Sequence, residues 1–412
     1  MRSIVIAGLA ASISMLAANA QSQVQQEARP VSNVYGQLFP NPTGTNGYEE
    51  FVRAGDLARN SDTWFRYEQA QGGQSLSAMR MVLSDPQVRQ ALLLVRQGLR
   101  KPVSTAHPNM DDETVLPELA LYRSLARMMS VEMYVQLAEG RVGDAISTLG
   151  DALKFSYMVH ADTLVGALVS IAMDRIAVKR LADHLDQLSI RDCDRLMNVV
   201  TDWLKAPDPS VKILEGERAS MRRMFQKYRS QPTKLLDTLY PGLKDDPKGQ
   251  KTHGFLTAQF TQHPESVGAA FDQTLSLLDG YYDGIAANAR KPMWERGDIP
   301  DPRDDGSVAA KLFGLLAPSF NRVTDRYGSN LAQLQMLGVH AAIRKYRWEH
   351  DRLPDNLEQL HIGTLAVDPF SGKPLVYKRI DDKSYDLYSL GPMDRGTQDQ
   401  PPSGQRAPVR AN

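Results

Sequence analysis

The chain has 412 residues, of which 42% are hydrophobic and 23% charged, a composition that is ordinary for a globular protein and excludes general disorder. Lysine plus arginine and aspartate plus glutamate both number 48, so the formal net charge is zero. A neutral chain has no overall field to attract nucleic acid or an anionic membrane. We therefore expect no nucleic-acid partner, and any partner has to recognise a local patch.

The N-terminus has the three parts of a cleaved export signal. Arg2 supplies the positive charge, residues 3–17 form an apolar run, and Ala18-Asn19-Ala20 is a small-x-small cleavage motif. A retained anchor helix is the alternative, but the run is shorter than the roughly 20 residues that span a bilayer. No cysteine follows the motif, which argues against lipid attachment. The sequence predicts a periplasmic or extracellular protein whose mature chain begins after Ala20.

The only cysteine is Cys193, so no intramolecular disulfide can form. It lies between Asp192 and Asp194, and their negative charges disfavour a thiolate. We interpret Cys193 as a half-buried helix residue and not as a nucleophile.

Residues 21–47 are rich in Gln, Pro, Asn, Gly and Thr and lack apolar periodicity, which predicts a flexible leader. Residues 48–306 read as a helical body. Within it, apolar residues recur every three or four positions in 119–137, Gly140 ends that helix, and 141–160 predict an antiparallel partner. The pair resembles one tetratricopeptide-type hairpin, without a second copy at a fixed period.

Residues 163–188 are the most apolar stretch of the mature chain. Asp174 and Arg175 interrupt the apolar run, so it cannot span a bilayer, and we expect a helix buried in a bundle. The mature chain is therefore predicted to have no transmembrane segment. Ser189, with Asp192 three residues later, predicts a helix start of the capping-box kind.

The segment 210–230 is basic and carries aromatic and methionine residues, which is compatible with a phosphate-rich partner or a membrane surface. The zero net charge and the nearby Glu215 and Glu217 favour a solvated helix face instead. The Asp-rich loop "DIPDPRDDGS" lacks the order of an EF-hand, which favours a solvated turn over a calcium site. A long helix then follows from about Ser307, kinked or split at Pro318.

The common sequence motifs of catalysis, metal binding and phosphate binding are missing. The sequence has no H-E-x-x-H, G-x-S-x-G, C-x-x-C or phosphate-binding glycine loop, and its eight histidines are scattered. His340 and His350, ten residues apart, point to different faces of a straight helix. This pattern favours a non-enzymatic binding protein. A periplasmic hydrolase with a dispersed site of His, Asp and Glu is the alternative.

The segment "DPFSGKPLVYKRIDDKSYDLYSLGP", residues 368–392, alternates as a sheet does. It predicts a strand at 375–380, a reversal at 381–383 and a return strand on which Tyr385, Leu387 and Ser389 share a face. Two strands alone are marginal in water, so we expect the hairpin to pack on the preceding helix.

Three motifs in residues 335–396 carry a family resemblance: "AAIRKYRWEHDRLPDNLEQL", "DPFSGKPLVYK" and "YDLYSLGP". This region resembles the C-terminal part of type II secretion major pseudopilins. The chain as a whole resembles exported bacterial proteins in which a helical body ends in such a tail. Its export signal is of the cleaved type and a helical body intervenes, so the resemblance does not imply filament assembly.

In pseudopilins the loop after S-L-G binds calcium. Here that loop is "GPMDRGTQDQ", and the resemblance makes Asp394 and Asp399 candidate calcium ligands. The usual Asp-Gly after Gly-Pro is replaced by Met393-Asp394-Arg395, which leaves a plain surface loop as the alternative. The Pro- and Gly-rich residues 397–412 predict a disordered tail.

The sequence therefore predicts a mainly α protein, a helical bundle or irregular α-solenoid, with a small C-terminal α+β module of helix and hairpin within residues 307–396. The leading hypothesis for its function is an exported binding or cell-envelope assembly protein with a protein partner in the envelope. An accessory of a secretion apparatus that docks through the C-terminal module is a further alternative.

Overall fold

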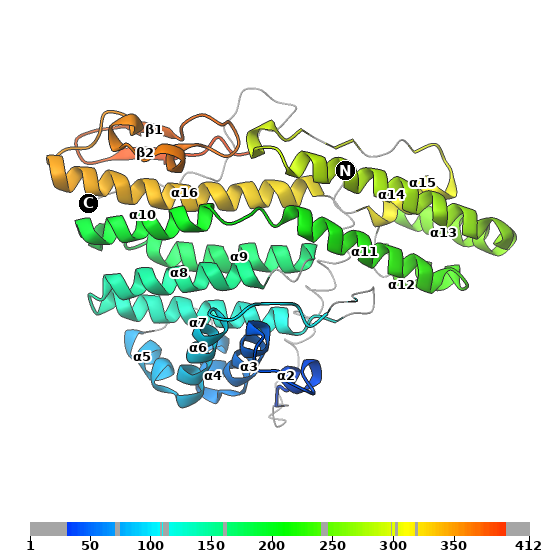
Figure 1. Ribbon diagram of the computed structural model, residues 1–412, viewed down its shortest axis with the longest axis horizontal. Helices are drawn as coiled ribbons and strands as arrows, with labels where there is room; N and C mark the ends of the chain where they lie inside the picture. Colours follow the sequence, from blue (N-terminus) through cyan, green and yellow to red (C-terminus); the bar gives the residue numbers. More distant parts are fainter. Residues whose placement is uncertain are drawn as a thin grey trace.

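The computed structural model describes residues 31–70, 75–107, 109, 115–159, 163–239, 246–297, 299–300, 304–317 and 320–392. These residues contain fifteen α-helices, α2 to α16, several 3-10 turns and one two-stranded antiparallel sheet (Figure 1). The prediction of a mainly α fold with a small C-terminal hairpin is confirmed. The predicted signal peptide, Asp394, Asp399 and the tail lie outside the described residues.

Five short helices at the N-terminal end pack beside α7 (Glu118–Ala138). They are α2 (Val34–Leu38), α3 (Gly47–Asn60), α4 (Asp62–Gln69), α5 (Leu76–Ser84) and α6 (Pro86–Gly98). The last four begin at Asn46, Ser61, Ser75 and Asp85, whose side chains accept hydrogen bonds from backbone N–H groups of the first turn.

Part of the range that we expected to be a flexible leader is fixed to α3. The carboxylate of Asp56 accepts hydrogen bonds from the Ser32 hydroxyl at 2.5 Å and from the backbone N–H groups of Val34 and Tyr35 at 3.1 and 2.7 Å. The lack of apolar periodicity led us to predict a flexible segment. The segment is nevertheless ordered, because polar hydrogen bonds hold it in place.

Helices α3 and α6 cross at glycines. A Cβ atom on Gly98 would lie 2.4 Å from Cε1 of Phe51, and one on Gly47 would lie 2.4 Å from the carbonyl oxygen of Gly98. We expect Gly98→Ala to lower the free energy of unfolding by about 1–3 kcal/mol, because the added methyl group separates the two helices. Urea denaturation measures this change. Gly254→Ala, where a Cβ meets nothing within 4 Å, is the control and should cost nothing; equal effects would contradict the crossing.

The middle of the molecule is a set of long helices lying side by side (Figure 1). Helix α7 is followed by α8 (Val142–Met158), α9 (Leu164–Ala182) and α10 (Ile190–Leu204), and α16 (Phe320–His350) lies against α9 and α10. Among the helices of the described ranges, none is both long and apolar enough to cross a bilayer.

The predicted hairpin of α7 and α8 is confirmed. Gly140, with φ at 72°, ends α7, and the Thr148 hydroxyl donates to Oε1 of Gln136 at 3.0 Å across the two helices. The rings of Tyr122 and Phe155 lie 5.6 Å apart nearer the other end of the pair, so the helices run antiparallel.

Helix α10 begins at the predicted capping box, in which Ser189 and Asp192 each bond the other's backbone N–H. Cys193 is fully buried and not half-buried as expected. Burial raises the pKa of its thiol to about 11, and the charges of Asp192 and Asp194 make smaller contributions. The interpretation as a packing residue agrees with this environment, although desolvation is the main reason.

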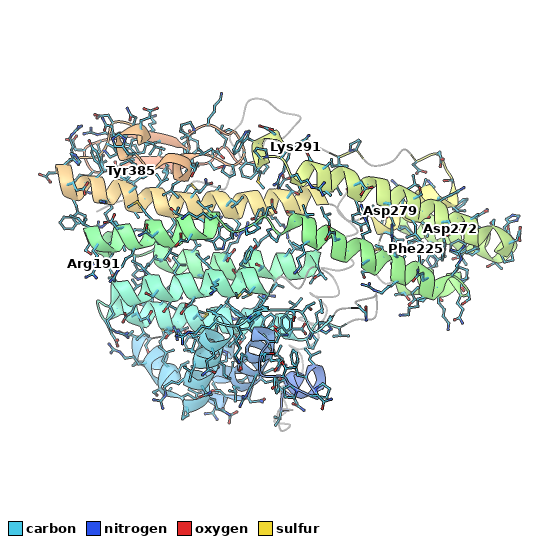
Figure 2. The ribbon with its side chains drawn as sticks, in the orientation of Figure 1. Arg191, Phe225, Asp272, Asp279, Lys291 and Tyr385 are labelled. Atoms are coloured by element: carbon cyan, nitrogen blue, oxygen red, sulfur yellow. The ribbon has the colours of Figure 1, made fainter. Side chains whose placement is uncertain are left out.

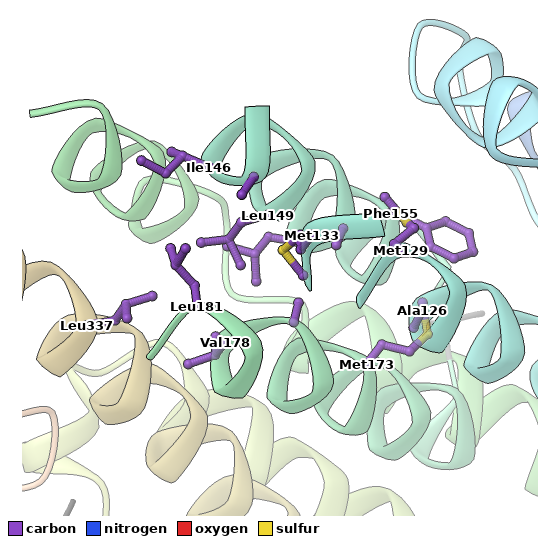
Figure 3. Close-up of a cluster of buried hydrophobic side chains, with 14 of the residues drawn as sticks. Ala126, Met129, Met133, Ile146, Leu149, Phe155, Met173, Val178, Leu181 and Leu337 are labelled. Carbon is purple, nitrogen blue, oxygen red and sulfur yellow. The ribbon is translucent and has the colours of Figure 1, made fainter. Parts of the chain in front are cut away.

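The first hydrophobic core fills the space between these helices and also reaches the N-terminal helices and the C-terminal module. Figure 3 shows its centre, where Met133 of α7 lies close to Leu149 of α8, and Met129 of α7 lies close to Phe155 of α8. The methionines of α7 are fully buried here, so they are packing residues of the core.

A second core lies in the arm that extends to one side in Figure 1. The arm comprises α11 (Ser210–Tyr228), α12 (Pro232–Leu239), α13 (Pro247–Gln262), α14 (Val267–Ala289) and α15 (Val308–Leu316). The Phe225 and Phe271 rings pack edge to face at 4.9 Å, and those of Tyr281 and Phe313 at 5.4 Å. The helical body thus contributes to two cores. The predicted split of the helix from Ser307 is confirmed, because α15 ends at Leu316 and α16 begins at Phe320.

The basic face of α11 is paired with acids of α14 (Figure 2). Both terminal nitrogens of Arg229 contact the carboxylate of Asp272, at 2.6 and 2.8 Å, and Arg222 contacts Asp279 at 2.7 Å. The guanidinium of Arg229 holds the pKa of Asp272 below its usual value. The charges of Arg222 and Arg229 are therefore balanced by acids of α14, and not by the expected Glu215 and Glu217.

The hairpin pairs β1 (Val376–Arg379) with β2 (Tyr385–Tyr388), with Val376 opposite Tyr388. Tyr385, Leu387 and Ser389 are buried and the residues between them are not, as the alternation predicts. The hairpin packs on α16, where Nδ1 of His340 lies 2.8 Å from the Tyr385 hydroxyl. Burial lowers the pKa of His340 to about 4, so the imidazole is neutral at pH 7.

A buried carboxylate holds the C-terminal module together. Asp368, from the D-P-F turn, is fully buried. It accepts hydrogen bonds from the backbone N–H of Phe370 at 2.9 Å, the Ser389 hydroxyl at 2.9 Å and the backbone N–H of Leu390 at 2.8 Å. The turn that precedes β1 is thus tied to the segment that follows β2.

Candidate functional site

A pocket lies where the two cores meet. Its walls come from the end of α8, α9, the junction of α10 and α11, the C-terminal end of α14 with the segment after it, and the first half of α16. Its empty space is about 960 Å³, counting the part open to solvent. The pocket therefore joins elements that the chain separates by more than a hundred residues.

Most of the pocket wall is apolar. Leu164 and Ile171 come from α9, Ile213 and Leu214 from α11, and Ile285 from α14. Ile213, Leu214 and Ile285 are nevertheless buried, so they serve both the fold and the pocket. Such a wall binds the apolar part of a small molecule.

The pocket contains a buried carboxyl group on α9. Asp174 is 2% exposed, and Nδ2 of Asn330 on α16 donates to its Oδ2 at 2.7 Å. The Ser156 hydroxyl of α8 contacts its other oxygen. Burial raises the pKa of Asp174 to about 7, and these two hydrogen bonds only partly oppose it. Asp174 is therefore close to half protonated at neutral pH.

The hydrogen bonds of the Ser156 hydroxyl agree with partial protonation of Asp174. Its oxygen lies 2.8 Å from the Leu153 carbonyl oxygen as well as in contact with Asp174, yet a hydroxyl carries one hydrogen. When that hydrogen is donated to Leu153, the contact with Asp174 is a hydrogen bond only if Asp174 carries a proton and donates it. The local geometry thus accommodates both protonation states.

Two polar atoms of the pocket residues are buried without a hydrogen-bond partner: Oδ1 of Asn330, an acceptor, and Nε1 of Trp203, a donor. Asn330 is 1% exposed. An unpaired buried polar atom costs about 1–3 kcal/mol, and native structures contain few of them. Both atoms belong to residues that line the pocket, which makes them candidate contacts for a bound group.

Arg296 closes one side of the pocket. It donates to the carboxylate of Asp208 at 2.6 Å and to the carbonyl oxygens of Ala289 and Lys291 at 2.8 and 3.0 Å. Asp208 lies between α10 and α11, so these bonds attach the segment after α14 to that junction. The role of Arg296 is to hold the pocket wall, and Asp208 balances its charge.

A second buried polar cluster involves His107 and Glu118. The Glu118 side chain is fully buried, and its Oε1 accepts from the Tyr48 hydroxyl at 2.9 Å and lies 2.8 Å from Nε2 of His107. This cluster attaches the segment before α7 to the start of α7 and to α3. Because Tyr48 belongs to the first core, we assign the cluster to the fold.

The sequence-predicted metal ligands Asp394 and Asp399 lie outside the described residues, so calcium binding there stays a prediction. Within the described residues no group of three or more His, Cys, Asp or Glu is placed to hold a metal ion. In the Asp-rich loop, Asp304 pairs with Lys311 at 2.6 Å and Asp305 bonds the backbone N–H of Ser307. His350 stacks on Tyr346, away from the partner of His340.

Sequence reasoning missed Asp174 as a site residue and used it only as an interruption of the apolar run. One signal was present: the residues three and four positions away are Ser170, Ile171, Ala177 and Val178, so no basic side chain on the same helix face can pair with it. An unpaired acid within the most apolar helix indicates a buried carboxyl group. Asn330 and Trp203 carried no such signal, because the fold alone brings them to Asp174.

Comparison of this chain with family models, curated proteins and solved structures found no match. The pocket therefore has to be interpreted from its own residues.

Proposed function

We propose that this chain is an exported binding protein that holds a small, mainly apolar molecule in the pocket between its two cores. The observation that carries this proposal is the pair of buried, unpartnered polar atoms, on Asn330 and Trp203, within a mostly apolar wall. An apolar wall supplies affinity, and a few fixed polar atoms orient the ligand. The cleavage motif that ends at Ala20 is the basis for proposing export.

The alternative of a hydrolase requires a base and a nucleophile within reach of each other. No histidine is among the described residues that line the pocket, and Ser156, which contacts Asp174, is fully buried. The buried pair of His107 and Glu118 faces the first core. The arrangement therefore favours binding over catalysis.

The proposal predicts that 1-pentanol binds in the pocket. Its hydroxyl can donate to Oδ1 of Asn330 or accept from Nε1 of Trp203, and its chain fits the apolar wall. Ligand-observed NMR should show saturable binding to the wild-type protein. Ala289→Phe, which adds a ring to the wall of the pocket, should weaken binding about tenfold or more, the effect of losing roughly 1.4 kcal/mol.

The matched control is Ala258→Phe, because Ala258 is on α13 and is not among the residues that line the pocket. This variant should bind 1-pentanol as the wild type does. Absence of saturable binding to the wild type, or equal binding to Ala289→Phe, would overturn the proposed function. Circular dichroism establishes that both variants are folded.

A further inference from the structure

The buried end of the pocket presents two acceptors next to each other. Nδ2 of Asn330 donates to the Asp174 carboxyl group, so Oδ1 on the same amide lies beside that hydrogen bond. This oxygen has no partner of its own. A group that carries several N–H hydrogens can donate to Oδ1 of Asn330 and to Asp174 together, whereas a carboxylate would meet only like charge and lone pairs.

The charges of the pocket favour the same kind of group. The charged residues in its described wall are Asp174, Asp325 and Arg296. Arg296 is balanced by Asp208 at 2.6 Å, outside the wall. When Asp174 is ionised, its carboxylate is a negative charge in this wall whose hydrogen-bond partners, Ser156 and Asn330, are both neutral.

Aromatic rings surround the same space. Tyr157, Trp203 and Tyr327 line the pocket, from α8, α10 and α16. The face of such a ring attracts a cation, most strongly where water is excluded. The wall can therefore accept a positive group next to its apolar part.

We propose that the pocket binds a small organic ammonium ion, whose N–H groups donate to Asp174 and Asn330 and whose apolar part contacts the leucine and isoleucine wall. This inference rests on the proposed function and gives the chemical class of the ligand.

Binding of such a cation depends on pH, since it requires ionised Asp174. With the pKa of Asp174 at about 7, the ionised fraction falls about tenfold from pH 8 to pH 6, and the affinity for the cation falls with it. The other titratable or charged side chains around this end of the pocket are Tyr157, Asp208, Glu217, Arg296, Asp325 and Tyr327. Burial raises the pKa values of Glu217 and Tyr327, and the Leu164 N–H bonds Glu217 at 2.8 Å.

The test compares three probes of one length: n-pentylamine, 1-pentanol and pentanoate. Dissociation constants are measured by NMR titration at pH 8 and pH 6. We expect n-pentylamine to bind at least tenfold more tightly than 1-pentanol at pH 8 and to lose about tenfold at pH 6, while 1-pentanol changes little. Pentanoate should bind more weakly than 1-pentanol.

Asp174→Asn should remove the advantage of n-pentylamine, so that the ratio of its dissociation constant to that of 1-pentanol, both measured on this variant, approaches one. Asp144→Asn is the matched control, because this acid of α8 has a side chain that is 60% exposed and pairs with Arg141. It should keep the advantage.

Equal affinities for n-pentylamine and 1-pentanol, or tightest binding of pentanoate, would overturn the ammonium inference and leave the pocket as a binding site. Failure of all three probes to bind would overturn the proposed function together with the inference. The two failures are therefore distinguishable.

Discussion

Asp174→Asn is expected to make the protein more stable relative to the wild type as the pH rises from 4 to 8. The pKa of Asp174 is about 7 in the folded protein, against about 3.9 for an aspartate in an unfolded chain. Between these values the folded state binds the proton that the unfolded state has released, so wild-type stability falls as the pH rises. The loss is complete above pH 7 and amounts to on the order of 4 kcal/mol.

Asparagine is neutral throughout this range, so the variant lacks that loss. Urea denaturation at pH 4, 6 and 8 gives the free energy of unfolding of both proteins. The difference, variant minus wild type, should increase by several kcal/mol from pH 4 to pH 8. The control Asp144→Asn should show no such trend. A difference that stays constant with pH would show that Asp174 is not buried in the way described.

Phe155→Ala is expected to lower the free energy of unfolding by about 3–5 kcal/mol. Phe155 of α8 is 0% exposed, and its ring lies 4.8 Å from that of Phe51 on α3 and 5.6 Å from that of Tyr122 on α7. Removing the ring leaves a cavity between three helices that cannot all move to fill it.

The control is Phe65→Ala on α4, because Phe65 is 39% exposed in the folded protein. Its effect should be clearly smaller, about 1–2 kcal/mol, because part of this side chain is already in water in the folded protein. Urea denaturation of the two variants at one pH gives both values. Similar losses for the two would contradict the placement of Phe155 at the centre of the first core.

Local features of the fold follow from the sequence because their causes are local. The cap at Ser189, the helix end at Gly140 and the alternation in 385–389 each depend on residues within a few positions. The burial of one face of each helix was also predictable. Which helix covers that face was not, because apolar periodicity identifies a buried side without its partner.

The division into two cores and the pocket between them depend on distant contacts. Asp272 and Asp279 balance α11 from a helix more than forty residues away, and the hydrogen bond of Asp174 with Asn330 spans 156 residues. Asp56 fixes Ser32, Val34 and Tyr35 through polar hydrogen bonds, which apolar periodicity does not register. The candidate site is thus a product of tertiary structure, and Asp174 alone had a signal in the sequence.

A crystal structure of the protein with 1-pentanol tests the central claim most directly, that the pocket between the two cores is a ligand site. We expect the alcohol in the pocket, with its hydroxyl 2.7–3.2 Å from Oδ1 of Asn330 or Nε1 of Trp203 and its chain against Ile171 and Ile213. An empty pocket whose two polar atoms are hydrogen-bonded to neighbouring protein groups would contradict the account.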